Sequence, residues 1–482
     1  MKRSRASVTL MGVVLLLTAS VCAQEGGQVE ALEPARRPVA ITGPETFQNL
    51  WFPVHWPYEG LFPGNEEAPL FVPARHEDVL GIFGNEKPVF LIYAQDDGPT
   101  LHIEEIRVED GPTGLSMNDK MVYLWLMKHE DLEWVEKAAV DELKHLRTLV
   151  LGDMDFFDEE EYEEGVQWVQ GIMRKIQQAA PGVFLVILAF VPAEFVAPLR
   201  PRGLWLESLE IEKGEDGLHG VTSADPAFFQ DIEYLLLPGF PEEEEEVEIV
   251  KGVLKSMPRL RYLALLGESA DIEMLTALKH LRCLLLAVED SESMESIGKM
   301  TQLQELALVV KKDGKDEEAL DLSFLAPLTE LRTLFLLTEA VPVKDLDFLA
   351  GMKHLTTLGL PRGTTQERFA KVIAAHPALE TVHLLQEEEG GVHDLSPLKN
   401  LPNLNILAMN GDRIDPEELK ELQNLKLLVA LKPEVDDELV ARLKEHLPEC
   451  EVVVGACMGS GYALALLVPV LLAVLLRRRA RR

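Results

Sequence analysis

The chain has 482 residues, of which 47% are hydrophobic, and a formal charge of −35 because 81 Asp and Glu outnumber 46 Lys and Arg. The apolar content allows a large core, either in two to four domains or in one long repetitive body. Such an acidic body repels nucleic acid and anionic membrane surfaces, so both are disfavoured as partners. The four cysteines form no CxxC pair, which argues against a zinc site and a disulfide framework.

Residues 1–23 are typical of a secretory signal peptide. A basic start precedes the apolar stretch Val8–Val21, and Val21-Cys22-Ala23 forms a small-residue cleavage site. In the alternative, a lipoprotein signal, Cys22 would be lipidated, but Val21 is too large for the position before that cysteine. We therefore predict cleavage after Ala23 and export of the rest.

Residues 24–95 are predicted to form a polar leader followed by an aromatic N-terminal cap. Val89–Tyr93 is predicted to be a buried strand of that cap. Such an aromatic cluster could stack on sugars, but the open end of a repeat array needs an atypical cap, and we favour that interpretation. The aromatic residues are Phe47, Trp51, Phe52, Trp56, Tyr58, Phe62, Phe71, Phe83, Phe90 and Tyr93.

Residues 96–454 repeat a six-residue figure with apolar residues at positions 1, 4 and 6. It is clearest in Leu260/Leu263/Leu265 and Leu281/Leu284/Leu286, and Ile103/Ile106/Val108 is interpreted as a degenerate first copy. One copy cannot bury its apolar side alone, so the pattern predicts a stack of neighbouring copies. The other copies begin at Met121, Leu146, Val183, Leu206, Ile232, Leu303, Leu331, Leu355, Leu379, Leu404, Leu425 and Leu447.

Several segments between the copies have helical periodicity. The apolar faces include Val166 to Ile176, Val247 to Leu254, and Phe369 to Ile373. The acidic run at 242–246 suits a helix N-terminus, where negative charge is favourable. We therefore predict short strands alternating with helical or irregular returns.

The figure resembles the leucine-rich repeat, whose period is 20–29 residues. The segment Asp394–Leu404 is most similar to internalin-type bacterial surface repeats. The resemblance implies an α/β solenoid with a parallel concave sheet and a helical or irregular convex side. The family's asparagine ladder is replaced here by Glu268, Glu289 and Asp412. The backbone polar groups of the turns after the strands must therefore find other hydrogen-bond partners.

Alternation along a strand points positions 4 and 6 into the core, and positions 3 and 5 to the other face. That second face is predicted to be exposed and apolar, which is typical of an interaction site with aromatic anchors. The alternative is that long neighbours or the N-terminal segment cover it. The candidate binding residues are Tyr123, Trp125, Tyr234, Tyr262, Leu285, Phe335 and His383, and the same rule directs Leu185 and Ile187 outward.

We find no motif for catalysis, a metal or a cofactor. His145, His280 and His354 recur in one Lys-His-Leu figure, so they belong to the scaffold. The acidic loop at 153–158 lacks the glycine and ligand spacing of a calcium loop. No cofactor and no catalytic residue are therefore predicted.

Residues 455–482 form an apolar tail that ends in arginines. Met458–Leu476 is uncharged and, as a helix, nearly long enough to span a hydrocarbon core. One interpretation is a permanent transmembrane anchor with the repeats outside. The other is a cleaved tail, because Cys457, Gly459 and Gly461, the apolar span and Arg477–Arg482 together resemble Gram-negative sorting signals.

The sequence thus predicts a surface-displayed protein that binds a protein or peptide through its concave face without catalysis. Its membrane contact would be the C-terminal helix. The alternatives are a passive surface spacer and, less favoured, an enzyme with its site in residues 24–95, where His55 and His76 are the obvious bases.

Overall fold

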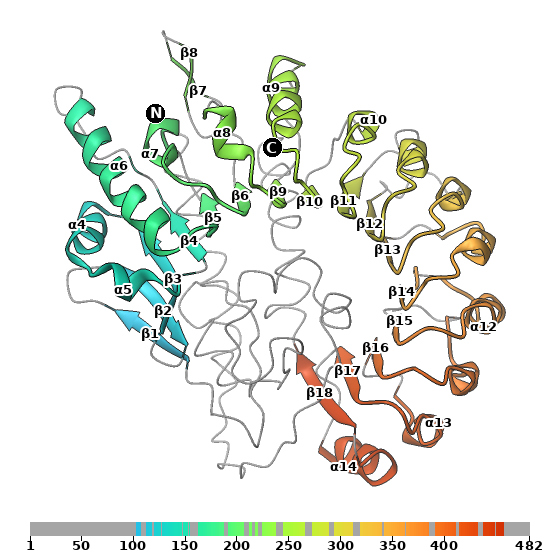
Figure 1. Cartoon of the computed structure of the whole chain (residues 1–482). Coiled ribbons are helices and arrows are strands. Elements are labelled where there is room, and N and C mark those ends of the chain that lie inside the picture. The colour runs from blue at the N-terminus through green and yellow to red at the C-terminus, as the bar shows by residue number, and fades with distance from the viewer. Residues whose placement is uncertain are drawn as a thin grey trace, which may run out of the picture.

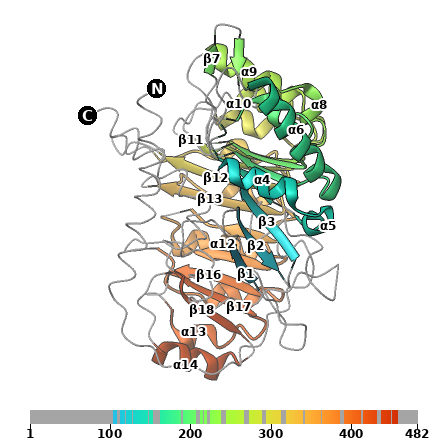
Figure 2. The same cartoon turned by 90° about the vertical axis from the view of Figure 1, so that its left-hand side faces the viewer.

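A computed structural model shows the chain as a curved solenoid (Figure 1), with the strands along its inner side and the helices along its outer side. Figure 2, the view from the side, shows the strands stacked one above another. The structure describes residues 103–456, except 108–111, 118–119, 127, 147, 153, 155–161, 188–190, 207–211, 215–216, 220–223, 238–243, 266–271, 289–293, 312–318, 340–341, 362, 385–390, 411–413, 432–436 and 449.

A 16-stranded sheet runs through the described residues. From β3 to β18 every neighbouring pair is parallel, and only β1, β2 and β3 pair antiparallel at the first edge. The strands are β1 (Ile103–Arg107), β2 (Thr113–Met117), β3 (Lys120–Leu126), β4 (Thr148–Leu151), β5 (Phe184–Ile187), β6 (Gly203–Leu206), β9 (Tyr234–Leu237), β10 (Tyr262–Leu265), β11 (Cys283–Val288), β12 (Glu305–Lys311), β13 (Thr333–Glu339), β14 (Thr357–Gly359), β15 (Thr381–Leu384), β16 (Ile406–Asn410), β17 (Leu427–Leu431) and β18 (Glu451–Ala456).

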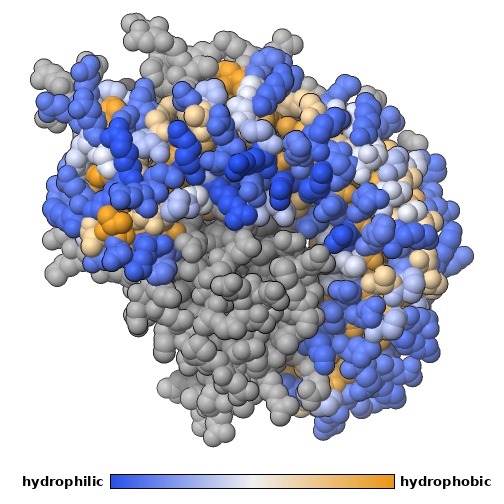
Figure 3. Space-filling model, viewed as in Figure 1, coloured by the Kyte–Doolittle hydropathy of each residue, from blue (hydrophilic) through white to orange (hydrophobic). Residues whose placement is uncertain are grey.

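The returns on the convex side are helices of unequal length, as predicted. The α-helices are α4 (His129–Lys137), α5 (Val140–Leu143), α6 (Tyr162–Ala179), α7 (Ala193–Val196), α8 (Pro226–Phe229), α9 (Glu244–Lys255), α10 (Ile272–Leu275), α12 (Gln366–Ala375), α13 (Pro416–Leu419) and α14 (Asp437–His446). The 3-10 helices are η3 (Glu295–Lys299), η4 (Ser323–Leu325), η5 (Asp347–Gly351) and η6 (Ser396–Asn400). The outer surface of these returns is mainly hydrophilic (Figure 3).

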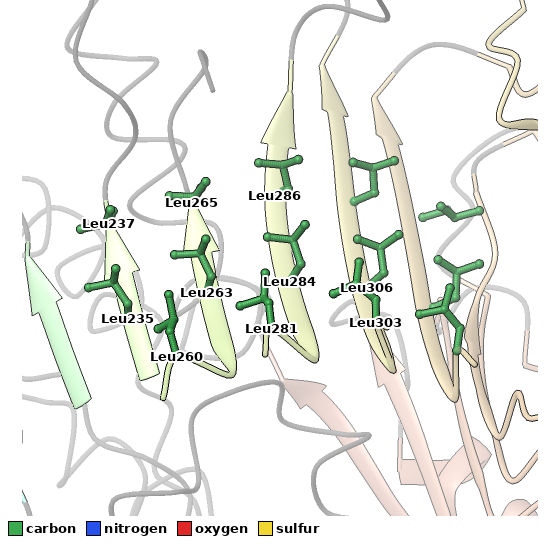
Figure 4. Packing of buried hydrophobic residues seen from close by; sticks show 14 of the residues in the cluster. Leu235, Leu237, Leu260, Leu263, Leu265, Leu281, Leu284, Leu286, Leu303 and Leu306 are labelled. Atoms are coloured by element: carbon green, nitrogen blue, oxygen red, sulfur yellow. The ribbon is translucent and has the colours of Figure 1, made fainter. Parts of the chain in front are cut away.

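The leucines of successive copies form rows inside the coil. Leu260, Leu281 and Leu303 lie at one level, before the strands, and Leu263, Leu284 and Leu306 lie at the next (Figure 4). All are almost fully buried in one continuous core. The predicted helical faces pack on this core too, for example Ile176 of α6 and Phe369 of α12. The leucine-rich-repeat fold is therefore confirmed.

Adjacent returns are tied together by side chains on the convex side. The Gln366 side chain accepts from the backbone N–H groups of His393 and Asp394, and donates to the carbonyl of Asp394. Several returns begin with a turn in which an aspartate accepts from the backbone two residues on. Asp321, Asp345, Asp394 and Asp415 do so. These turns start η4, η5, η6 and α13, where no regular helix could be predicted.

Three predicted copies are out of register with the sheet. In β5, Leu185 and Ile187 pair with Leu149 and Leu151 and lie in the core, so their predicted outward orientation is wrong. Residues 183–188 are all apolar, and an unbroken apolar run gives no period-2 phase. The copy that was predicted to begin at Leu206 is also out of register. Leu206 is the last residue of β6, and the prediction placed it before a strand. In the last copy, Val452 aligns with Leu428 and therefore occupies position 4 of the figure, whereas the prediction placed it at position 6.

Two features at the edges of the repeat pattern were not predicted. Ile103–Arg107 forms an antiparallel hairpin strand, so it is not a degenerate repeat copy. A separate hairpin, β7 (Glu212–Gly214) with β8 (Gly217–His219), stands out beyond the arc (Figure 1).

Within the described part of the chain, no helix combines the length and apolar character that crossing a bilayer requires. The predicted signal peptide, aromatic cap and tail lie outside the described residues.

Candidate functional site

The inner face of the sheet from β9 to β15 carries most of the predicted binding residues. The third positions of these strands align across the sheet, and so do the fifth positions. The third positions are Tyr234, Tyr262, Cys283, Glu305, Thr333, Thr357 and Thr381. The fifth positions are Leu236, Ala264, Leu285, Ala307, Phe335, Gly359 and His383.

An apolar cluster on this face is separate from the leucine core. We call it the concave patch and define it as Leu236, Tyr262, Ala264, Cys283, Leu285, Ala307 and Phe335. Its central members are buried: Cys283 is 1% exposed and Leu285 is 4% exposed. The sequence left open whether this face is exposed or covered. In the structure its central side chains are buried, whereas Leu236, Tyr262 and Phe335 are partly buried. The small side chains of Ala264 and Ala307 are flanked on the adjacent strands by larger ones.

One end of the concave patch is a pair of tyrosines. The rings of Tyr234 and Tyr262 stack with centroids 4.3 Å apart and an interplanar angle of 7°. The Arg202 guanidinium lies 5.8 Å from the centroid of the Tyr234 ring, and it also pairs with Glu233 at 3.3 Å. Burial, with smaller effects of Cys283 and Glu305, raises the pKa of Tyr262 to about 12. The Tyr262 hydroxyl is thus neutral at pH 7, and a cation, Arg202, flanks the other ring of the pair.

A thiol and a carboxylate follow the tyrosines on the next two strands. Cys283 Sγ donates to Glu305 Oε2 at 3.2 Å. Burial raises the pKa of the Cys283 thiol well above its usual value, and the Glu305 carboxylate raises it further. A thiol held in its protonated form is a poor nucleophile. Cys283 is therefore a poor candidate for a nucleophile.

The other end of the concave patch contains the Phe335 ring, which meets the His383 ring edge-on. The centroids are 4.8 Å apart with an interplanar angle of 78°. Gly359 lies between them on β14, and a Cβ atom there would come within 2.4 Å of Phe335 Cδ1. The missing side chain is what allows the two rings to meet across the intervening strand.

Three polar atoms beside these rings have no hydrogen-bond partner. They are Thr357 Oγ1, Thr381 Oγ1 and His383 Nε2. The two threonines are fully buried, and the His383 ring is partly exposed although its Nε2 is not. Burial lowers the pKa of His383 to about 4, so the ring is neutral at pH 7. Because buried polar groups in proteins are almost always bonded, this end of the patch has unused hydrogen-bonding capacity.

The other predicted site residues lie apart from the concave patch. Tyr123 and Trp125 are on β3, where their backbones pair with Thr148 and Val150, and three strands separate them from β9. Cys457, Gly459 and Gly461 lie outside the described residues. The structure therefore brings Tyr234, Tyr262, Leu285, Phe335 and His383 into one surface.

Several residues of this surface were not predicted from the sequence. Trp205 of β6 aligns with Val186 and Leu236 at the fifth position, and it was missed because its copy was placed in the wrong register. Thr357 and Thr381 recur with Thr333 at one repeat position, a signal that was visible in the sequence. Glu305 and Gly359 gain their importance only from neighbours on adjacent strands.

Among the residues described, no group of three or more His, Cys, Asp and Glu is arranged to hold a metal ion. What the surface offers is apolar area, aromatic faces and hydrogen-bonding groups.

No family model matches the chain, and no curated protein matches it. Among solved structures, the chain is similar to internalin C2 from Listeria monocytogenes, with 22% identity and a TM-score of 0.29 over 42% of this chain and 84% of that one. It is similar to a leucine-rich-repeat protein of Leptospira interrogans, with 15% identity and a TM-score of 0.31 over 67% of this chain and 92% of that one. It is also similar to a structure of the Toll–Spätzle complex of Drosophila, with 9% identity and a TM-score of 0.35 over 73% of this chain and 47% of that one.

Proposed function

We propose that this leucine-rich-repeat protein is a non-catalytic recognition protein whose concave patch binds an extended segment of a protein or peptide. The observation that carries the proposal is one surface with two aromatic pairs, an apolar centre and unpaired polar atoms. Curved repeat proteins in general use such inner surfaces for binding. Stacked or edge-on aromatic rings supply contact area at a low cost in conformational entropy.

An extended peptide suits both halves of this surface. Its side chains can enter the apolar centre near Leu285, and its main chain offers N–H and C=O groups to Thr357, Thr381 and His383. Adjacent strands lie roughly 4.8 Å apart, so the path from β9 to β15 covers about 29 Å. A peptide of about nine residues at roughly 3.3 Å per residue spans that path. A small molecule would reach only one of the two aromatic pairs.

The cellular setting that we propose rests on the two ends of the chain. Residues 1–23 have the pattern of a signal peptide, and Met458–Leu476 has the pattern of a membrane span followed by arginines. These support an exported protein held at the cell envelope by its C-terminal tail, or released when the tail is cut near Cys457. Mass spectrometry of the mature protein separates the two: an intact Arg482 means an anchor, and an end near Cys457 means sorting.

A passive surface spacer is the second candidate function. The burial of Cys283 and Leu285 favours it, because side chains with little exposed surface offer less to a ligand. A spacer needs the solenoid but not the unpaired polar atoms beside Phe335.

The proposal is tested by selecting peptides from a displayed random library on the full-length chain. Selection on the wild type should enrich apolar and aromatic sequences that do not bind a Tyr262→Ala/Phe335→Ala variant. The control is Lys371→Ala on convex helix α12, a residue whose ammonium bonds Asp347 at 2.6 Å. Enriched peptides that bind the concave variant as well as the control would overturn the proposal and leave the spacer as the better candidate.

A further inference from the structure

We infer that the concave patch binds an acidic protein segment, whose carboxylates are held by a row of arginines at the edge of the sheet where the strands begin. This partner class rests on the proposed function, because it concerns what the same surface binds. We call that edge the entry rim. It consists of the residue at position 2 of each figure and the two residues before position 1, from β6 to β14.

Backbone hydrogen bonds align the position 2 residues of successive strands. The N–H of Arg282 donates to the carbonyl of Arg261 at 2.8 Å, and the N–H of Gln304 donates to the carbonyl of Arg282 at 2.7 Å. The entry rim is therefore one continuous edge, although its residues lie far apart in the sequence. In Figure 4 the position 1 leucines mark this edge: Leu260, Leu281 and Leu303.

The entry rim is basic on a strongly acidic chain. It contains eight Arg and Lys residues against three Asp and Glu residues, whereas the whole chain has 46 against 81. Two of the three acids are already paired, Asp231 with Arg259 at 2.9 Å and Glu233 with Arg202 at 3.3 Å. The rim thus has a surplus of positive charge. The eight cations are Arg200, Arg202, Arg259, Arg261, Lys279, Arg282, Arg332 and Lys353, and the third acid is Glu330.

The centre of this surplus is Arg261 and Arg282, at the start of β10 and β11. Arg261 is exposed, and Arg282 is partly exposed while its guanidinium donates to the carbonyls of Lys279 and Leu281, each at 3.2 Å. Within the described part of the chain, no carboxylate forms an ion pair with either arginine. Their strands lie roughly 4.8 Å apart, so the two side chains can hold one carboxylate or two adjacent ones.

The two arginines lie directly beside the tyrosine end of the concave patch. Arg261 precedes Tyr262 and Arg282 precedes Cys283, both of which belong to the patch. Burial raises the pKa of Tyr262 to about 12, and the Arg261 charge opposes that rise, so this cation acts on the patch. One residue covers roughly 3.3 Å along a strand. A ligand with an apolar anchor on the patch therefore finds cations next to it.

Glu305 of β12 limits the basic stretch on one side. Its carboxylate accepts from Cys283 Sγ at 3.2 Å and faces the patch, and the position 2 residue before it, Gln304, is neutral. Acidic groups of a ligand are thus attracted at β10 and β11 and repelled at β12. The surface therefore orients the ligand, with its acidic residues at the tyrosine end.

The shortness of the basic stretch favours an acidic protein segment over a long polyanion. Three strands at roughly 4.8 Å spacing cover only about 10 Å. Nucleic acid carries charge along its whole length and would extend onto the rest of a body with charge −35. Two or three Asp or Glu residues beside an apolar anchor match both the arginines and the patch. The acidic remainder of the surface rejects the same segment elsewhere.

Peptide selection on charge-reversed full-length chains tests the inference. Wild type is compared with Arg261→Glu/Arg282→Glu and with Arg174→Glu/Arg442→Glu. The second variant makes the same change in net charge at exposed arginines of convex α6 and α14. Wild type and the convex control should enrich Asp and Glu next to apolar residues, relative to the unselected library. The rim variant should lose that enrichment.

The affinity of one selected peptide gives the magnitude. Arg261→Glu/Arg282→Glu should weaken binding at least about tenfold, because like charges repel across an interface, and the convex control should keep the wild-type affinity. Replacing the Asp and Glu residues of the peptide by Asn and Gln should remove the difference between wild type and rim variant. Arg261→Glu alone should still weaken binding at least about threefold, and it leaves the Arg282 hydrogen bonds intact.

A wild-type pool without acidic enrichment, or equal affinities for wild type and rim variant, would overturn the inference. A single-stranded DNA oligonucleotide or heparin that binds wild type as tightly as the peptide, and not the rim variant, would also overturn it, because the rim would then recognise polyanions in general. Peptides that need Tyr262 and Phe335 but lack acidic residues overturn this inference alone. Peptides that bind Tyr262→Ala/Phe335→Ala as well as wild type overturn the proposed function.

Discussion

Tyr234 and Tyr262 lie on neighbouring parallel strands with their rings 4.3 Å apart and only 7° from parallel. The pairing Tyr262↔Tyr234 in the β10–β9 ladder imposes this contact, because equivalent residues of parallel strands stand side by side on the sheet. The same relationship repeated along the arc turns single residues of successive copies into one surface. Function is therefore expected from rows of residues that the repeats align.

The pH dependence of stability should reveal the partly buried Tyr262 hydroxyl. Its pKa is raised to about 12, above the value of about 10 for an unfolded tyrosine. A raised pKa means that the unfolded chain loses this proton first, so stability is complete below pH 10 and falls as pH rises toward 12. We expect Tyr262→Phe to weaken that fall in the urea midpoint. Equal slopes for wild type and variant between pH 10 and 12 would contradict the burial of this group.

His383 should make stability depend on pH in the acidic range, where stability falls as pH falls. Burial lowers its pKa to about 4, below the ordinary value of 6.5. The unfolded chain therefore binds the proton first, and stability that is complete above pH 6.5 is lost as pH falls toward 4. His383→Gln should be less sensitive than wild type across this window in thermal unfolding. Equal pH sensitivity of wild type and His383→Gln between pH 4 and 6.5 would contradict the burial of this ring.

Gly359→Ala should disturb the Phe335–His383 contact. The new Cβ atom would lie 2.4 Å from Phe335 Cδ1, so the ring must move and the stability should fall by about 1–3 kcal/mol. Gly252→Ala in α9 is the control, since a Cβ there meets nothing within 4 Å. Helix propensity predicts a gain of about 0.5–1 kcal/mol for the control. A Gly359→Ala protein with an unchanged urea midpoint would show that the rings do not meet over this residue.

Alanine substitutions in the leucine core should reduce stability far more than alanine substitutions on the convex surface. Leu284 is fully buried among Leu263 and Leu306, so Leu284→Ala should cost about 2–5 kcal/mol. Lys279→Ala, an exposed change in the preceding return, should stay within about 0.5 kcal/mol. Urea unfolding of the two variants makes the comparison. Similar midpoints would mean that the coil around β11 is not the continuous core that the structure shows.

The fold was predictable because fourteen copies of one figure repeat a short-range pattern. Leu260, Leu263 and Leu265 alternate clearly with polar or small residues, so both strand and register follow from the sequence. The register of residues 183–188 was predicted wrongly, because an unbroken apolar run does not show which of its side chains face the core. The short returns that begin at Asp321 and Asp345 contain 3-10 helices of three and five residues, which are too short to show a helical period.

The candidate site was predictable as rows of residues but not as contacts. Tyr262 and Phe335 were identified by position alone. The Cys283–Glu305 hydrogen bond and the space at Gly359 depend on which residues neighbouring strands align, across sequence separations of 22 and 24 residues. The exposure of the face could not be predicted for the same reason: alternation tells which face a side chain joins but not how much of that face is buried.

The central claim is that the concave patch is the binding surface, and the affinities of one selected peptide test it most directly. Its dissociation constant is measured by titration calorimetry for wild type, Tyr262→Ala, Phe335→Ala and the convex control Lys371→Ala. We predict at least a tenfold weakening for each patch variant, as expected when an aromatic anchor worth more than about 1.4 kcal/mol is removed, and no change for the control. Equal affinities for all four proteins would contradict the claim.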